Sequence, residues 1–115
     1  MHELGIAESI VSTINKTMES NSYTTVSGIG LRIGEMTDIV EDSLRFGMEA
    51  LTKGTSLEGV DVTIEIVPLQ GRCKKCQEEF RIVEFLFVCP GCKSVEIEII
   101  KGKELDISYL EVETE

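Results

Sequence analysis

The sequence has no tryptophan, a single histidine and two prolines, and aromatic residues make up only 5% of the chain. Basic residues are also scarce: 11 lysines and arginines stand against 21 acidic residues, which gives a formal net charge of -10. Binding to duplex nucleic acid depends on basic side chains that neutralise phosphates. The charge balance therefore argues against a nucleic-acid-binding protein.

The sequence also lacks any continuous apolar run long enough to span a bilayer. Its first residues, MHELGIAESI, have neither the basic start nor the apolar stretch of a secretory signal. We therefore expect a cytoplasmic protein without membrane contact. In a reducing compartment, four cysteines in two close pairs favour metal binding over disulfide formation.

The composition is that of a folded protein: of the 115 residues, 42% are hydrophobic and 28% are charged. This length suits one core with a small satellite. Residues 3–20 predict an amphipathic helix, because their apolar residues recur at spacings of three and four. These residues are Leu4, Ala7, Val11, Ile14 and Met18.

Alternating apolar residues predict strands over 24–33, 60–66 and 104–113. In the first strand, Gly28 and Gly30 suggest a close approach by a helix. A second helix is expected from Asp38, as the capping residue, to a stop at Gly54. The fold class is thus α+β, with a small three-stranded sheet packed with two helices and an inserted module. We expect residues 1–69 and 103–115 to form one domain and residues 70–102 the module.

The inserted module contains two CxxC pairs, formed by Cys73, Cys76, Cys89 and Cys92. Two cysteines separated by two residues can bind one ion from a tight turn, and two such pairs complete a tetrahedral thiolate site. A closed site of this kind is structural, and zinc is the expected metal. Iron in a rubredoxin-like site, a redox dithiol and a disulfide pair remain as alternatives.

Basic and apolar residues surround these cysteines. Arg72, Lys74, Lys75 and Lys93 either compensate the thiolate charge or form a solvated surface. Apolar residues also gather between and after the pairs, and we expect them to form a small core for the module. They are Phe80, Ile82, Val83, Phe85, Leu86, Phe87, Val95, Ile97 and Ile99. About thirty residues seldom fold alone, so metal binding should supply much of the folding free energy.

The only histidine, His2, lies directly before the first helix. A bulky second residue hinders removal of the initiator methionine, so the Met1 amine, the His2 imidazole and the backbone nitrogens of His2 and Glu3 are close in sequence. Such nitrogens suit nickel or copper. The competing interpretation is a solvated terminal histidine, with Glu3 complementing the helix dipole.

Several motifs together resemble the HypA (HybF) family of hydrogenase maturation proteins. They are M1-H2-E3, the stretch G34-E-M-T-D-I-V with the following L44-R-F and A50-L-T-K-G-T-S-L-E-G, the segment I64-E-I-V-P68, and the two CxxC pairs. The similarity runs essentially from end to end. No single piece is decisive, but their order and spacing make the match specific.

This resemblance implies a nickel metallochaperone that delivers Ni(II) for maturation of [NiFe]-hydrogenase. Nickel would be bound by His2, with the Met1 amine and the Glu3 backbone as further candidate ligands. The four cysteines would bind zinc. The implied partners are a HypB-like nickel GTPase and the hydrogenase large subunit. The chain has no histidine near the cysteines, so a histidine of the module cannot contribute to nickel binding.

Two other classes of function compete with this interpretation. A zinc-ribbon adaptor without nickel function would use the module only to present a protein-binding surface. An enzyme is not expected, because the sequence shows no nucleophile paired with a base, no phosphate-binding glycine loop and no open metal site with a general base.

Overall fold

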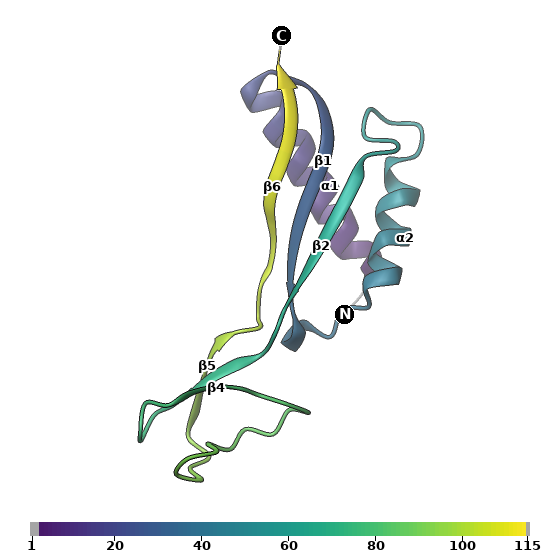
Figure 1. The fold of residues 1–115 in the computed structure, drawn as a ribbon. Helices are drawn as coiled ribbons and strands as arrows, with labels where there is room; N and C mark the ends of the chain where they lie inside the picture. Colours follow the sequence, from purple (N-terminus) through teal and green to yellow (C-terminus); the bar gives the residue numbers. More distant parts are fainter. Residues whose placement is uncertain (1–2, 115) are drawn as a thin grey trace. The chain divides into compact units, whose positions relative to one another are not determined.

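The computed structural model describes residues 3–114 and contains two helices, one 3-10 turn and six strands (Figure 1). In chain order they are α1 (Glu3–Asn21), β1 (Tyr23–Gly34), η1 (Glu35–Thr37), α2 (Glu41–Thr52), β2 (Asp61–Val67), β3 (Gln70–Cys73), β4 (Glu79–Arg81), β5 (Ile97–Lys101) and β6 (Leu105–Thr114). The predicted α+β class is confirmed. No helix within residues 3–114 is long and apolar enough to cross a membrane.

The contacts divide the described chain into two compact units. The first comprises residues 3–32, 39–65 and 106–114, and the second comprises residues 33–38 and 66–105. The second unit thus includes the turn η1 as well as the cysteine segment. The predicted division into a domain of residues 1–69 and 103–115 and a module of residues 70–102 stays a prediction.

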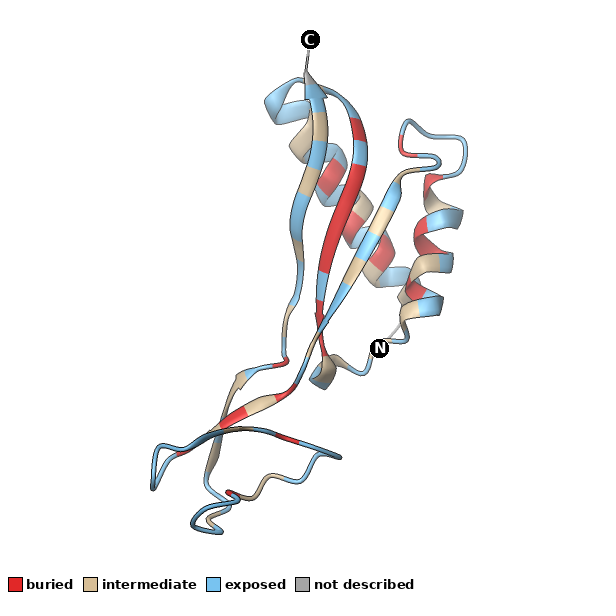
Figure 2. Cartoon of the chain, in the orientation of Figure 1, coloured by how far each residue is buried: buried red, intermediate tan, exposed pale blue. Residues whose placement is uncertain are grey.

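The first unit has its core between the two helices and the sheet β2-β1-β6. Helix α1 contributes Ala7, Ile10 and Ile14, which are buried as their helical spacing predicts. On the central strand β1, Ile29 and Leu31 are also buried. Figure 2 shows these buried segments on the two helices and along β1. The predicted three-stranded sheet with two helices is therefore confirmed.

The two glycines of β1 do not serve close helix packing, so that prediction was wrong. A Cβ atom at Gly30 would lie 2.1 Å from the ring of Tyr109, and one at Gly28 would lie 2.7 Å from the carboxylate of Glu111. Both neighbours belong to β6. The glycines therefore leave room for side chains of the neighbouring strand.

The start of α2 also differs from the prediction. Asp38 has a left-handed backbone with φ 57°, and the capping position belongs to Val40, which has extended dihedrals. The carbonyl oxygen of Val40 accepts a hydrogen bond from Leu44 N at 3.1 Å. The sequence resembled a capping box, but the helix begins two residues later.

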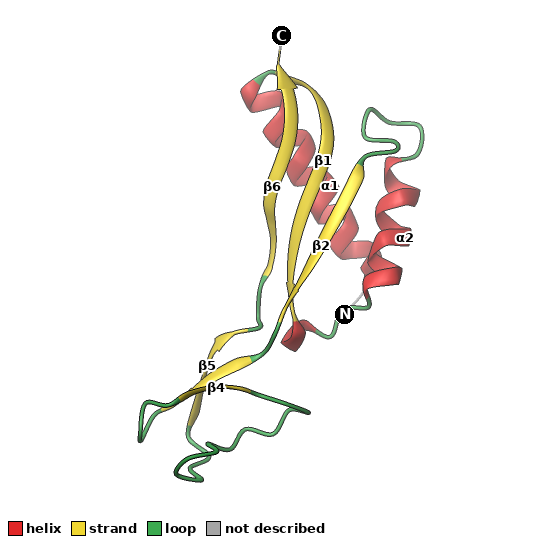
Figure 3. Cartoon of the chain, viewed as in Figure 1, coloured by secondary structure: helices red, strands yellow, loops and turns green. Residues whose placement is uncertain are grey.

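The second unit contains the sheet β4-β3-β5, in which β3 pairs antiparallel with both neighbours. Most of the segment between β4 and β5 is loop (Figure 3). The turn η1 belongs to this unit through backbone bonds from Gly34 N to Glu104 O and from Met36 N to Gly102 O. In addition, Glu35 accepts a hydrogen bond from Leu69 N at 3.0 Å.

Arg72 stands opposite a glutamate on each side of β3, Glu79 on β4 and Glu98 on β5. Its guanidinium lies 2.9 Å from the Glu79 carboxylate and 3.5 Å from that of Glu98. Because all three side chains are partly exposed, solvent weakens these pairs. We expect Arg72→Ala to lower the free energy of unfolding by no more than about 1 kcal/mol, measured by urea denaturation of the metal-loaded protein. A loss above about 2 kcal/mol would contradict this assignment.

Candidate metal centre

The four cysteines of the two CxxC pairs lie together in the second unit. Their sulfur atoms are all within 4.8 Å of one another, and Cys73 and Cys89 are buried while Cys76 and Cys92 are exposed. Each pair therefore contributes one buried and one exposed cysteine to the sulfur cluster.

The first pair lies on a tight turn that follows β3. Cys73 N donates to Glu78 O, and Gln77 N donates back to Cys73 O, both at 2.9 Å. Cys76 N points to the Cys73 sulfur at 3.5 Å. Gln77 has a left-handed backbone, and its side-chain amide donates to Lys74 O. These bonds turn the chain so that both sulfurs face one point.

The second pair repeats this turn bond for bond. Cys89 N donates to Ser94 O at 2.9 Å, Lys93 N donates to Cys89 O at 3.0 Å, and Cys92 N points to the Cys89 sulfur at 3.5 Å. Lys93 is left-handed like Gln77, and its amine donates to Pro90 O. Both turns thus aim N–H groups at a sulfur, as metal-binding CxxC turns require.

The distances between the sulfur atoms fit an ion with tetrahedral coordination. Zinc–sulfur bonds of about 2.3 Å place neighbouring sulfurs about 3.8 Å apart. The Cys73 and Cys92 sulfurs lie 3.5 Å apart, as do those of Cys76 and Cys89. A disulfide requires about 2.05 Å, and all four cysteines are free. The donor set therefore suits a thiophilic metal ion and not a disulfide pair.

The contacts within the cluster shift the pKa values of the two thiols of the first pair in opposite directions. The backbone N–H of Cys76 lowers the pKa of the Cys73 thiol from 9.0 to about 6, although burial opposes the shift. The pKa of Cys76 is raised to about 12, because the contact with Cys89 and burial outweigh the backbone N–H of Glu78, which lowers it. Of the two cysteines of this pair, Cys73 is thus the one more readily present as a thiolate.

Two of the four basic residues beside the cysteines pair with glutamates of the same unit. Besides the Arg72 pairs, the Lys75 amine lies 4.0 Å from the Glu96 carboxylate. Because these partners are glutamates and not cysteine sulfurs, compensation of the thiolate charge stays a prediction.

The apolar residues after β4 do not form the core that the sequence predicted. Ile82 is buried, but Val83, Phe85 and Leu86 are 60%, 54% and 65% exposed. Glu84 and Phe85 both have left-handed backbones and form a turn that is closed by a hydrogen bond from Leu86 N to Val83 O at 3.1 Å. Contiguous exposed apolar residues are typical of interaction surfaces.

The predicted nickel ligands lie at the other end of the chain. Met1 and His2 lie outside the described residues. Glu3 is described and begins α1, and its carboxylate accepts a hydrogen bond from Val40 N at 3.1 Å. The backbone of α1 therefore starts beside that of α2.

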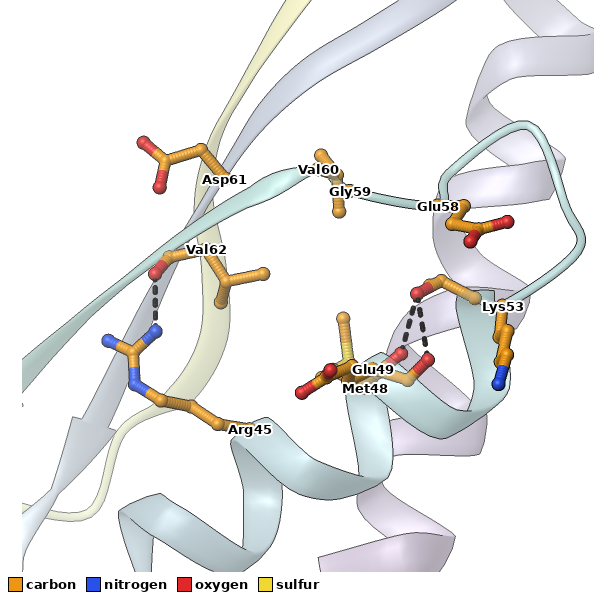
Figure 4. A pocket seen from close by; sticks show the side chains of 10 residues that line it. Arg45, Met48, Glu49, Lys53, Glu58, Gly59, Val60, Asp61 and Val62 are labelled. Atoms are coloured by element: carbon orange, nitrogen blue, oxygen red, sulfur yellow. Dashed lines mark hydrogen bonds between the residues drawn. The ribbon is translucent and has the colours of Figure 1, made fainter.

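A pocket of about 520 Å³ between α2 and β2 was not foreseen from the sequence (Figure 4). Arg45 lines this pocket. Its Nη1 donates a hydrogen bond to Val62 O at 2.7 Å, and its Nε pairs with the Glu41 carboxylate at 3.1 Å. Lys53 and Glu58 bring opposite charges to the lining. The only arginine of the pocket lining is thus already bonded, and the lining mixes two basic with three acidic side chains, so it offers no strong charge of one sign to a ligand.

The fold and the four clustered thiolate donors define a small metal-binding protein of the α+β class. The family model described as "Hydrogenase/urease nickel incorporation, metallochaperone, hypA" matches residues 1–112. The chain therefore belongs to the HypA family.

Named relatives support this membership. The chain is 35% identical over 113 residues to the hydrogenase maturation factor HypA of Desulfitobacterium hafniense, covering 98% of this chain and 99% of the relative. It is 38% identical to that of Lawsonia intracellularis, covering 98% and 100%. It is 39% identical to that of Desulfatibacillum aliphaticivorans, covering 97% and 87%.

Solved structures share the fold. A solution structure of HypA protein superposes with a TM-score of 0.75 at 20% identity, covering 100% of this chain and 98% of that chain. The solution structure of the Ni metallochaperone HypA from Helicobacter pylori gives 0.68 at 21% identity and covers all of both chains.

Proposed function

We propose that this protein carries Ni(II) for the maturation of [NiFe]-hydrogenase and that zinc in the four-cysteine site stabilises its second unit. The observation that carries the proposal is the HypA family match, which begins at residue 1 and so includes the Met-His-Glu start as well as both CxxC pairs. A nickel carrier does not itself transform a substrate, so we expect no enzymatic activity.

The two metals have different tasks. Cys73, Cys76, Cys89 and Cys92 would hold zinc in a closed set of donors that leaves no position for exchange. Nickel would bind at the amino terminus through His2, with the Met1 amine and the Glu3 backbone nitrogen as further ligands. Nitrogen donors suit Ni(II), and an exposed terminal site permits transfer to another protein.

The partners that we propose are a HypB-like nickel GTPase and the hydrogenase large subunit. Both belong in the cytoplasm with this chain. The start of α2 carries Glu41 and Asp42, which give this end of the first unit a negative surface. Opposite charge on a partner would raise the rate of encounter.

Nickel titration of the zinc-loaded protein tests the proposal. We expect His2→Ala to lower nickel affinity by at least about 100-fold, because it removes the only imidazole, and to leave the zinc content unchanged. A second variant with an uncleaved N-terminal extension retains His2 but removes the free amine, and its affinity reports whether that amine is a ligand. Wild-type affinity in His2→Ala would contradict the assignment.

The second candidate is a zinc-ribbon adaptor without nickel function. The exposed loop of Val83, Phe85 and Leu86 favours it, because this surface resembles a protein contact site. The same titration separates the two functions, since an adaptor would bind no nickel at the amino terminus.

A further inference from the structure

A groove of about 340 Å³ lies between α1 and α2 and is lined by residues of these two helices. Its apolar lining residues are Val11 and Leu51, and both are half-buried. Leu4 extends this apolar surface toward the start of α1. It is 53% exposed and lies over Gly47, where a Cβ atom would be 3.7 Å from the Leu4 Cδ1. The helix pair therefore keeps apolar side chains outside the core that it forms with the sheet.

Phe46 adds an aromatic ring to the same side of α2. It is 73% exposed, although it lies in the middle of a helix that buries Leu44 and Met48 (Figure 2). Because an α-helix has 3.6 residues per turn, Phe46 is about 200° around the helix from each of these two residues and points away from the core. It directly precedes Gly47, which faces α1. The ring thus stands beside the helix pair's groove, in contact with water.

The charges around this apolar surface are mostly negative. Glu8 and Glu19 line the groove together with one lysine. Asp42 and Glu49 lie four residues before and three residues after Phe46, on the same side of α2. None of these four carboxylates has an ion-pair partner within residues 3–114. We call these carboxylates, with the four apolar residues that they surround, the helix-pair face; the apolar residues are Leu4, Val11, Phe46 and Leu51.

We propose that the helix-pair face is a docking surface for a basic amphipathic helix of another protein. The side chains of a third helix can pack into a groove between two helices, and an apolar stripe on that helix would cover Val11, Leu51 and Phe46. Lysines and arginines beside the stripe would face the four carboxylates. The apolar contacts supply affinity, and the charges select the partner.

Charge argues against a second copy of this chain as the occupant. Two helix-pair faces in contact would bring four carboxylates against four, and each chain carries a formal net charge of -10. Like charges that face each other across an interface are unfavourable, whereas a basic helix turns the same carboxylates into favourable partners.

Two synthetic peptides serve as probes. Both have the length of α1, which is 19 residues, and leucines at helical spacing; one carries lysines beside the leucine stripe and the other carries glutamates. Fluorescence anisotropy at low salt measures their affinity for full-length zinc-loaded protein. We expect the lysine peptide to bind at least about tenfold more tightly than the glutamate peptide. Its amide chemical-shift changes should fall on α1 and α2, and its affinity should decrease with added salt.

Substitution of Phe46 tests the apolar contact. We expect Phe46→Ala to lower the affinity for the lysine peptide by at least about tenfold, because a central aromatic anchor of an interface is removed. Phe85→Ala is the matched control, since Phe85 is also an exposed phenylalanine but belongs to the second unit. Circular dichroism and zinc content show that both variants are folded.

Charge reversal tests the selection of the partner. The double variant Glu8→Lys and Glu19→Lys should bind the lysine peptide about 3- to 10-fold more weakly and the glutamate peptide more tightly than wild type. Glu65→Lys with Glu113→Lys makes the same change in net charge at exposed glutamates of β2 and β6. This control should leave the preference for the lysine peptide unchanged.

Three results would overturn the proposal: wild-type affinity in Phe46→Ala, equal affinity for the two peptides, or no binding of the lysine peptide at about 1 mM. Self-association of the protein that Phe46→Ala abolishes, seen by analytical ultracentrifugation, would assign the face to a second copy and overturn the proposal as well. The helix-pair face contains no candidate metal ligand. The nickel titration therefore tests the proposed function separately from this docking surface.

Discussion

Chelation of the zinc ion that we propose for the cysteine site is expected to unfold the sheet β4-β3-β5 while leaving the helices and the sheet β2-β1-β6 folded. The second unit has few apolar residues in its interior, and Val83, Phe85 and Leu86 of its long loop are exposed. Two of its buried side chains are Cys73 and Cys89 of the candidate metal site. The proposed zinc ion would therefore replace much of the hydrophobic core that this unit lacks.

The expected effect is large, because structural zinc contributes about 10–16 kcal/mol of binding free energy at neutral pH in small zinc modules. Amide hydrogen exchange after chelation measures the effect residue by residue. Protection should be lost at Cys73 and Lys74, whose N–H groups are bonded to Glu78 O and Glu96 O. Retention of this protection in the metal-free protein would show that the sheet folds without the ion.

The Cys73→Ser variant should reproduce the effect of chelation, because Cys73 is buried and supplies the thiolate with the lowered pKa. Lys74→Ala is the matched control, since it changes the next residue and leaves all four sulfurs in place. Acid should act in the same direction. Protons compete with the ion for the thiolates, so zinc retention should fall as the pH is lowered from neutral.

The Gly34→Ala substitution is expected to lower the free energy of unfolding by about 3 kcal/mol. A Cβ atom at Gly34 would lie 2.1 Å from both the carbonyl carbon and the carbonyl oxygen of Gly102, and 2.6 Å from Lys103 N. These are backbone atoms, so no side chain can swing away to make room. The bond from Gly34 N to Glu104 O, at 2.7 Å, would have to break or shift.

Urea denaturation of the metal-loaded protein, followed by circular dichroism, measures this loss. Gly5→Ala is the control, because a Cβ atom at Gly5 has no neighbour within 4 Å. Alanine there should stabilise α1 by up to about 1 kcal/mol, since glycine is a poor helix former. Equal effects of the two substitutions would mean that backbone flexibility, and not the contact with Gly102, decides the outcome at Gly34.

The sequence predicted the helices and strands well where a periodic pattern of apolar residues reflects the burial of one face of the element. Residues such as Ala7 and Ile14 recur at helical spacing and are buried on α1, and the alternation of Ile29 and Leu31 on β1 marks the face that is covered. The metal centre was predictable for a similar reason. The CxxC spacing is a local property of a turn, and both turns form it with the same hydrogen bonds.

Other features depend on contacts between segments far apart in sequence, and these were not predictable. Gly30 was assigned to helix packing, but only the pairing of β1 with β6 brings the Tyr109 ring onto it. Asp38 had the sequence of a cap, whereas Val40 takes that position and bonds Glu3. Phe85 is a core residue by its hydrophobicity, but it lies on an exposed turn of the loop after β4.

The bond between Arg45 and Val62 has a consequence for the behaviour of the protein in concentrated solution. Strand β2 lies at the edge of its sheet, where unpaired carbonyls can recruit a strand from another molecule and start aggregation. The guanidinium of Arg45 occupies the Val62 carbonyl on this edge, at 2.7 Å. A charged side chain bonded to an edge strand hinders pairing with a foreign strand. We therefore expect Arg45, which lines the pocket, also to lower the tendency of the chain to self-associate.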